Sequence, residues 1–125
     1  MPNPLFHSYL TIPWKSEYVK QKKNPNHCVL CAIVKKAAGV KNGEVFRYDM
    51  IIVLLNHYPY NPGHLLIAPL AHYEQFENVS SDLADHLTSM LQNGIRLLKL
   101  THQPSAFNIG LKLGHIAETS IKHLH

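Results

Sequence analysis

Two apolar runs joined by a turn-rich link place the strongest constraint on the fold. Residues 45–55 first alternate polar and apolar side chains and then become wholly apolar, which predicts a strand or a bent hairpin with a buried second half. Residues 64–68 form a second apolar run, closed by Pro69, and proline and glycine fill the link between the runs. Sequential strands joined in this way pair antiparallel. The sequence therefore predicts an antiparallel sheet.

A helix is predicted after residue 78, where the apolar spacing changes to a period of 3.6. A serine supplies the N-cap, acidic side chains lie in the first turns, and Arg96 and Lys99 lie near the end, as the helix dipole favours. The stripe consists of Leu83, Leu87, Met90, Leu91, Leu97 and Leu98. We expect it to pack against the sheet. A second, short helix is predicted over residues 32–38.

The C-terminal part of the sequence predicts further strands. Residues 105–111 alternate as a strand, and a strand over residues 121–125 would place His123 and His125 on one face. Two imidazoles that share a surface suit phosphate or metal chemistry, although they are also typical of a histidine-rich tail or an exposed strand. The preceding loop offers backbone N–H and hydroxyl donors to an anion, from Gly114, Thr119 and Ser120.

The length of 125 residues fits one domain with a sizeable core. Residues 1–26 contain four prolines but also many apolar side chains, so we expect this segment to pack onto the domain, residues 27–125, or onto a partner subunit. We expect no signal peptide, since residues 1–9 contain two prolines and no apolar run, and the longest apolar run of the chain is too short to span a bilayer. A soluble, cytoplasmic protein without membrane contact is expected.

The charge is unevenly distributed along the chain. Residues 1–43 carry seven lysines and one glutamate, which gives +6, whereas residues 44–125 carry five basic and seven acidic side chains, which gives −2. A basic half can attract nucleic acid or a phosphate-rich small ligand. It can equally be a solvated lysine face, because the lysines are not interleaved with aromatic residues. We consider nucleic acid the less favoured partner.

Cys28 and Cys31 form a CxxC motif and are the only cysteines. Such a pair can be a redox pair, half of a metal site, or two small buried side chains. Redox pairs usually follow a strand, and residues 24–27 do not read as one. Zinc binding and a plain structural role therefore remain as interpretations of the motif. A chain with only two cysteines is typical of a reducing compartment.

Several motifs, in order, give the chain a family likeness over nearly its whole length. They are residues 12–19, residues 28–31, residues 56–69 with His72 behind them, residues 107–114, and His123-Leu124-His125. The sequence resembles the histidine triad (HIT) superfamily and, within it, the diadenosine tetraphosphate phosphorylases, also called ATP adenylyltransferases. The resemblance implies an α+β fold with an antiparallel sheet of about five strands, one long helix and one short helix. It also implies a homodimer.

The resemblance also implies a zinc site and a catalytic residue. The structural zinc would be held by Cys28, Cys31, His72 and His123, with His27 as a competing ligand. His125 would attack an α-phosphate and form a nucleotidyl-histidine, from which phosphate or water takes the nucleotidyl group. The implied substrate-binding residues are Asn56, His64, Asn108, Lys112, Gly114, Thr119 and Ser120.

The family motif continues with a third histidine two residues beyond His125, so a C-terminally truncated domain is expected. The expected function is phosphorolysis of diadenosine tetraphosphate to ATP and ADP. Two alternatives remain open. One is a hydrolase of dinucleotides or nucleoside phosphoramidates on the same fold. The other is a zinc-stabilised nucleotide-binding module without turnover.

Overall fold

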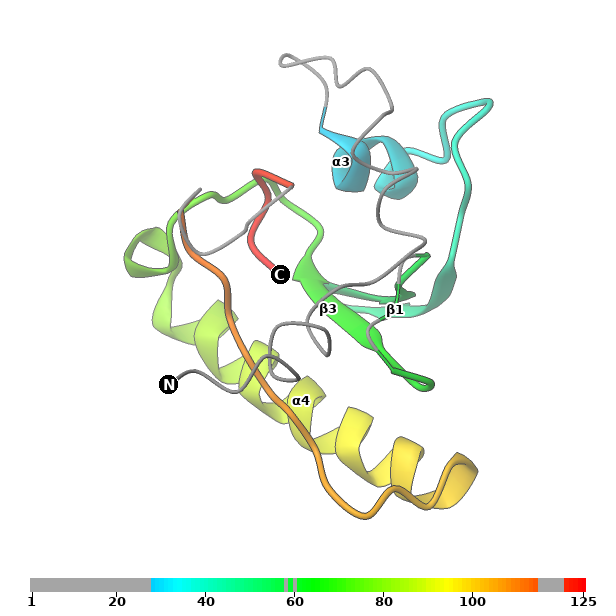
Figure 1. Ribbon diagram of the computed structural model, residues 1–125. Helices are drawn as coiled ribbons and strands as arrows, with labels where there is room; N and C mark the ends of the chain where they lie inside the picture. The colour runs from blue at the N-terminus through cyan, green and yellow to red at the C-terminus, as the bar shows by residue number, and fades with distance from the viewer. Residues whose placement is uncertain (1–27, 58, 60, 115–120) are drawn as a thin grey trace, which may run out of the picture.

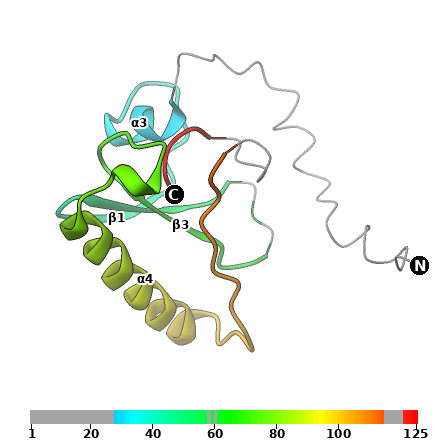
Figure 2. The same ribbon diagram turned by 90° about the vertical axis from the view of Figure 1, so that its left-hand side faces the viewer.

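The fold is a small antiparallel sheet with a helix on each face (Figures 1 and 2). This computed structural model describes residues 28–57, 59, 61–114 and 121–125. In chain order, its elements are α3 (Val29–Val34), β1 (Glu44–Tyr48), β2 (Ile51–Leu55), β3 (Leu65–Pro69), a 3₁₀ turn η1 (Phe76–Asn78) and α4 (Ser81–Thr101). The predicted N-terminal packing segment, residues 1–26, lies outside the described residues.

Strand β2 is the centre of the sheet, in the order β1-β2-β3, and both pairings are antiparallel as predicted. The run 45–55 is a hairpin that turns at Asp49, whose φ of 53° is left-handed. Before β1, Gly43 accepts a hydrogen bond from the N–H of Leu55. A Cβ at Gly43 would lie 2.9 Å from the Leu55 carbonyl oxygen, so this close approach requires glycine.

The wholly apolar sequence of β2 is explained by burial on both faces of the sheet. Ile52 and Leu54 pack with Leu30 and Ile33 of α3, whereas Ile51 and Val53 pack with Leu83 and Met90 of α4. A strand buried on one face only would keep polar side chains on the other. The two helices therefore close two separate apolar layers, one on each side of the same strand.

Helix α4 confirms the predicted long helix. It begins after Ser80, whose Oγ accepts a hydrogen bond from the N–H of Leu83 at 3.1 Å. Asp82 lies in its first turn and Lys99 in its last turn. Although α4 has 21 residues, no helix in the described part of the chain is long and apolar enough to cross a membrane.

The prediction of about five strands is wrong for the described residues, which form three strands. Residues 105–111 are not a strand, and the side chains of Ile109 and Leu111 are exposed. An alternating pattern alone does not make a strand, because a strand also needs a neighbouring chain to accept its hydrogen bonds. Figure 1 shows this segment, in orange, crossing in front of α4, and Figure 2 shows that the two separate along their length.

Residues 121–125 are not a strand either, so His123 and His125 do not share an exposed face. The N–H of Leu124 donates to the carbonyl of Tyr73 at 2.6 Å, which docks the segment on the loop after β3. His123 and Leu124 are both buried, which a period of two does not allow on a half-exposed strand. The short helix also differs from the predicted 32–38. Cys28 is its N-cap, so α3 begins at Val29, and it ends at Val34.

Candidate functional site

Two cysteines and two histidines from three separate segments form a candidate metal centre. Cys28 is the N-cap of α3 and Cys31 lies in its first turn, His72 lies in the loop after β3, and His123 lies in the docked C-terminal segment. One ligand atom from each residue lies within 4.8 Å of the other three. The structure therefore brings together the four residues that the resemblance implied as zinc ligands.

The distances fit a tetrahedral zinc ion. The Nδ1 atom of His123 is 3.3 Å from Sγ of Cys28 and 3.5 Å from Sγ of Cys31, and Nδ1 of His72 is 3.4 Å from Sγ of Cys31. Zinc–sulfur and zinc–nitrogen bonds of about 2.3 and 2.0 Å at a tetrahedral angle place sulfur and nitrogen about 3.5 Å apart. Two thiolates and two imidazoles are also a donor set that zinc prefers.

Both imidazoles present the same nitrogen to the cluster, because each has a hydrogen-bond acceptor at the other nitrogen. The Nε2 atom of His123 lies 2.9 Å from the carbonyl oxygen of Pro69, and Nε2 of His72 lies 3.3 Å from Oε1 of Glu74. A carbonyl or carboxylate oxygen accepts, so each Nε2 carries the proton and each Nδ1 keeps its lone pair. Metal-ligating histidines are commonly held in this way.

Burial changes the proton affinity of two groups in the cluster. It raises the pKa of the Cys31 thiol to about 11, helped by the hydrogen bond and charge of Cys28, whereas Lys35 acts in the opposite direction. Burial also lowers the pKa of His123, against the hydrogen bond to Pro69. A neutral imidazole is ready to bind a metal ion, whereas the thiols would release their protons on binding.

His125, the predicted nucleophile, is half-buried and tied to the same segment. Its Nδ1 lies 2.6 Å from the carbonyl oxygen of His123. Since a carbonyl can only accept, Nδ1–H is the donor and the lone pair of the neutral ring lies on Nε2. His123 thus connects the candidate metal centre to the ring that would perform the chemistry.

Asn56 and His64, both predicted to bind substrate, lie together at the loop end of the β2–β3 hairpin. The N–H of Asn56 donates to the carbonyl of His64 at 3.2 Å. The side-chain nitrogen of Asn56 is 3.3 Å from Nδ1 of the His64 ring. The two residues form a local pair, as their eight-residue separation across a hairpin allows.

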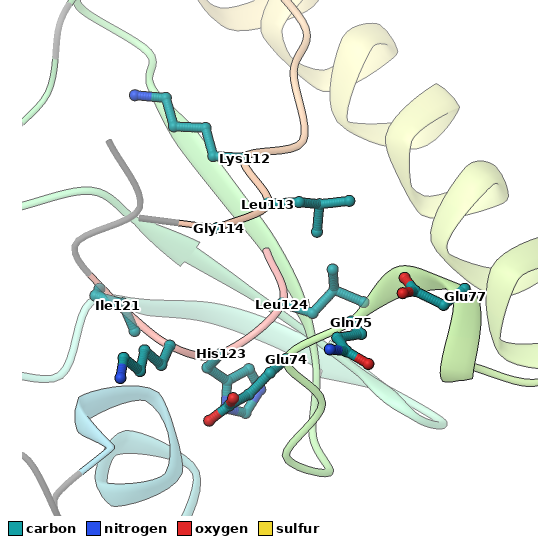
Figure 3. A pocket seen from close by; sticks show the side chains of 10 residues that line it. Glu74, Gln75, Glu77, Lys112, Leu113, Gly114, Ile121, His123 and Leu124 are labelled. Atoms are coloured by element: carbon teal, nitrogen blue, oxygen red, sulfur yellow. The ribbon is translucent and has the colours of Figure 1, made fainter. Parts of the chain in front are cut away.

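A pocket of about 420 Å³ lies between the loop after β3, residues 112–114 and the C-terminal segment (Figure 3). Its walls contain Lys112 and Gly114 from the predicted substrate-binding set, the metal ligand His123, and the carboxylates of Glu74 and Glu77. Figure 3 shows the side chain of Lys112 extending away from His123. The pocket thus adjoins the candidate metal centre.

Other predicted site residues are not brought into this arrangement. Asn108 is exposed, and it is not among the described residues that line the pocket. Thr119, Ser120 and the competing ligand His27 lie outside the described residues.

Sequence reasoning missed two groups that orient the ligands. One is the carbonyl of Pro69, for which no signal exists because every residue offers a carbonyl group. The other is Glu74, and here the signal was its position two residues after a candidate ligand histidine.

A comparison with known families agrees with the fold. The family model described as "HIT domain" matches residues 21–125. The chain therefore belongs to the HIT domain family, as the motifs had indicated. Over 124 residues it is 31% identical to "AP-4-A phosphorylase" from Mycobacterium tuberculosis, an alignment that covers 93% of this chain and 64% of that protein.

Solved structures give the same fold. A HIT family protein from Bacillus anthracis superposes with a TM-score of 0.74 at 20% identity, covering 82% of this chain and 71% of that one. A "ZN-bound histidine triad family protein" from Mycobacterium smegmatis superposes with a TM-score of 0.70 at 23% identity, covering 78% and 70%. The second of these proteins is described as binding zinc.

Proposed function

We propose that this chain transfers a nucleotidyl group from a diadenosine polyphosphate to an acceptor, through a covalent intermediate on His125. The observation that carries the proposal is the contact between Nδ1 of His125 and the carbonyl of His123, which leaves Nε2 as a neutral nucleophile. The similarity to the AP-4-A phosphorylase of Mycobacterium tuberculosis supports the substrate class. The chain spans 64% of that relative's length.

The proposed reaction has two displacements at one phosphorus atom. Nε2 of His125 attacks an α-phosphorus of diadenosine tetraphosphate, a P–N bond forms, and the P–O bond to the leaving ATP breaks. An oxygen of inorganic phosphate then attacks the same phosphorus, the P–N bond breaks, and ADP leaves with His125 neutral again. Water as the acceptor would give AMP instead, which is the hydrolase alternative.

In this proposal the metal centre positions the nucleophile. A zinc ion would be coordinated tetrahedrally by Cys28, Cys31, His72 and His123. Its contribution would be a rigid cross-link between the segments that carry these residues. His123 would then be held from both sides, by the metal and by Pro69, and it carries the carbonyl that orients His125. Transfer of a phosphoryl-type group depends largely on such positioning.

The remaining predicted residues would bind the substrate. Lys112 and Gly114 line the pocket beside His123. The backbone N–H of Gly114 suits a phosphate oxygen, and the Lys112 ammonium, which extends away from His123, would contact a phosphate farther from that residue. Asn56 would contact the ribose. His64 would lie close behind the catalytic histidine and have an orienting role. Asn108, Thr119 and Ser120 complete the proposed set, and a homodimer is the proposed assembly.

An intact-mass measurement tests the proposal directly. The protein is mixed with diadenosine tetraphosphate in phosphate-free buffer, and we expect a mass gain of one adenylyl group that is lost in His125→Ala. His102→Ala, which removes an exposed histidine at the end of α4, is the matched control and should keep the adduct. Added phosphate should discharge the adduct as ADP.

Each other outcome has a defined meaning. An adduct that persists in His125→Ala places the chemistry on another residue and overturns the assignment. Discharge to AMP, whether or not phosphate is present, identifies a hydrolase. Nucleotide binding without any adduct would identify the binding module and overturn the proposed activity.

A further inference from the structure

The two histidines of the candidate metal centre differ in their surroundings. His123 is only 1% exposed, and its outer nitrogen faces a backbone carbonyl. The side chain of His72 is 39% exposed. Packing therefore fixes the ring of His123, whereas the orientation of the His72 ring depends more on its hydrogen bonds.

Glu74 is the group that the structure places on the outer nitrogen of His72. Its Oε1 is 3.3 Å from Nε2, while Nδ1 of the same ring faces Sγ of Cys31 at 3.4 Å. The ring of His72 also meets the ring of His123 edge-on, with centroids 5.0 Å apart. Carboxylate, imidazole and thiol thus form a continuous chain that enters the cluster from its solvent side.

We propose that Glu74 is the positioning residue of the metal centre, and that it sets the zinc affinity and the rate of zinc loss through His72. This inference rests on the metal site proposed above. The carboxylate accepts the Nε2–H bond, keeps the lone pair on Nδ1, and makes the ring a stronger donor to the metal. It also resists rotation of an exposed ring, which is the step by which His72 would release the ion.

Glu74 lies on the wall of the pocket and not in the protein core. Glu74 and His123 both line the pocket beside the metal centre, and Figure 3 shows Glu74 among the side chains of that wall. Any change at Glu74 therefore acts on the centre from the pocket and not from the protein core. Because the residue is exposed, its substitution should leave the fold intact.

The test compares zinc affinity and zinc release across four variants, with zinc alone as the probe. Loss of an outer carboxylate partner typically costs about 10–100-fold in metal affinity, and an exposed pair belongs at the lower end. We expect Glu74→Ala to weaken zinc binding about tenfold and to speed its transfer to a chelator by a similar factor. Glu74→Gln and Glu74→Asp, which keep an acceptor, should recover part of the loss.

Glu77→Ala is the matched control. Glu77 is also exposed, has the same charge and lines the same pocket, and it belongs to η1 rather than to the metal centre. Its zinc affinity and release rate should equal those of the unchanged protein. A similar loss in Glu77→Ala would mean that any carboxylate of the pocket attracts the ion through its charge, which overturns the specific role of Glu74.

Cobalt(II) substitution separates positioning from direct ligation. The visible spectrum of the cobalt protein should keep its four-coordinate, thiolate-bound form in Glu74→Ala, whereas His72→Ala should change it. A spectrum in Glu74→Ala that matches that of His72→Ala would make Glu74 a ligand and overturn the inference. An unchanged zinc affinity in Glu74→Ala would overturn the inference as well.

Failure of the starting protein to bind zinc would overturn the metal site itself. The adenylyl adduct on His125 would still be measured independently, so the two proposals fail separately.

Discussion

At the scale of single residues, His123 is the one on which fold and function depend together. It is the most deeply buried polar side chain among the described residues, and its Nε2–H donates a hydrogen bond to the carbonyl of Pro69 at the end of β3. The same residue supplies Nδ1 to the candidate metal centre and a backbone carbonyl to His125. A change at this position is therefore not confined to metal binding.

His123 is buried whereas His72 is exposed, and the difference in their contribution to stability can be measured in the absence of metal. In protein treated with a chelator, His123→Ala should lower the free energy of unfolding by about 2–3 kcal/mol, because it leaves the buried Pro69 carbonyl unpaired and opens a cavity. His72→Ala, at an exposed site, should cost less than about 0.5 kcal/mol. Urea unfolding followed by circular dichroism gives both values. Equal losses would show that burial of His123 contributes nothing beyond its metal role.

The candidate ligands were predicted from the family resemblance and not from residue types alone. The CxxC motif marks Cys28 and Cys31, but His72 and His123 are two of ten histidines, and the resemblance selected them. The structure clusters all four residues. The tautomers were not predictable, because they depend on which oxygens face the outer nitrogens. A backbone carbonyl such as that of Pro69 leaves no trace in a sequence.

At the scale of elements, prediction succeeded where the signal is local. The period of α4, its serine cap and the turn between the strands are each contained within a few residues. Residues 105–111 show the limit of this approach, because alternation defines an extended backbone and pairing requires a distant partner. The docking of Leu124 on Tyr73 is likewise a contact between segments far apart in the chain.

His86 forms a pH-dependent contact between α4 and the β1–β2 turn. Its Nδ1 lies 2.7 Å from the carbonyl of Asp82 within α4, and its Nε2 lies 2.9 Å from Oδ2 of Asp49 in the β1–β2 turn. The hydrogen bond to Asp82 raises the pKa of His86 against partial desolvation, with the charges of Asp82, Asp49 and Asp85 acting in the same direction. Only the protonated ring can donate to both partners.

Because this pKa is raised in the folded state, the stabilisation is fully present below the unfolded-state pKa and is lost as pH rises through the folded-state value. We expect the unchanged protein to exceed His86→Gln in free energy of unfolding at about pH 5.5, and the difference to shrink by about pH 8.5. Asp49→Asn should reduce the pH dependence. A difference that grows with pH would contradict the assignment of His86 as a stabilising cation.

At the scale of the whole molecule, the candidate metal centre joins parts that the sheet does not. It connects α3, the loop after β3 and the C-terminal segment, whose own attachment includes the hydrogen bonds to Pro69 and Tyr73. Helix α4 packs on the opposite face, against Ile51 and Val53. Metal binding should therefore stabilise one side of the sheet more than the other.

Removal of zinc tests this division. Zinc held about a thousandfold above its dissociation constant should raise the free energy of unfolding by about 4 kcal/mol, and a Cys28→Ser/Cys31→Ser double variant should show no such gain. Hydrogen exchange should show the loss of protection on chelation in α3 and residues 121–125, with little change in α4. Uniform loss across the chain would show that the centre stabilises the molecule only as a whole.

The separation of the ligands along the chain also has a consequence during synthesis. His123 follows Cys31 by 92 residues. At translation rates of roughly 5–20 residues per second, the two thiols are made roughly 5–20 seconds before the last ligand exists. A nascent chain in this interval offers a bare dithiol that can bind soft metal ions or meet oxidants. The four-ligand set is therefore complete only when the last segment has been made, and until then the two cysteines are without His123.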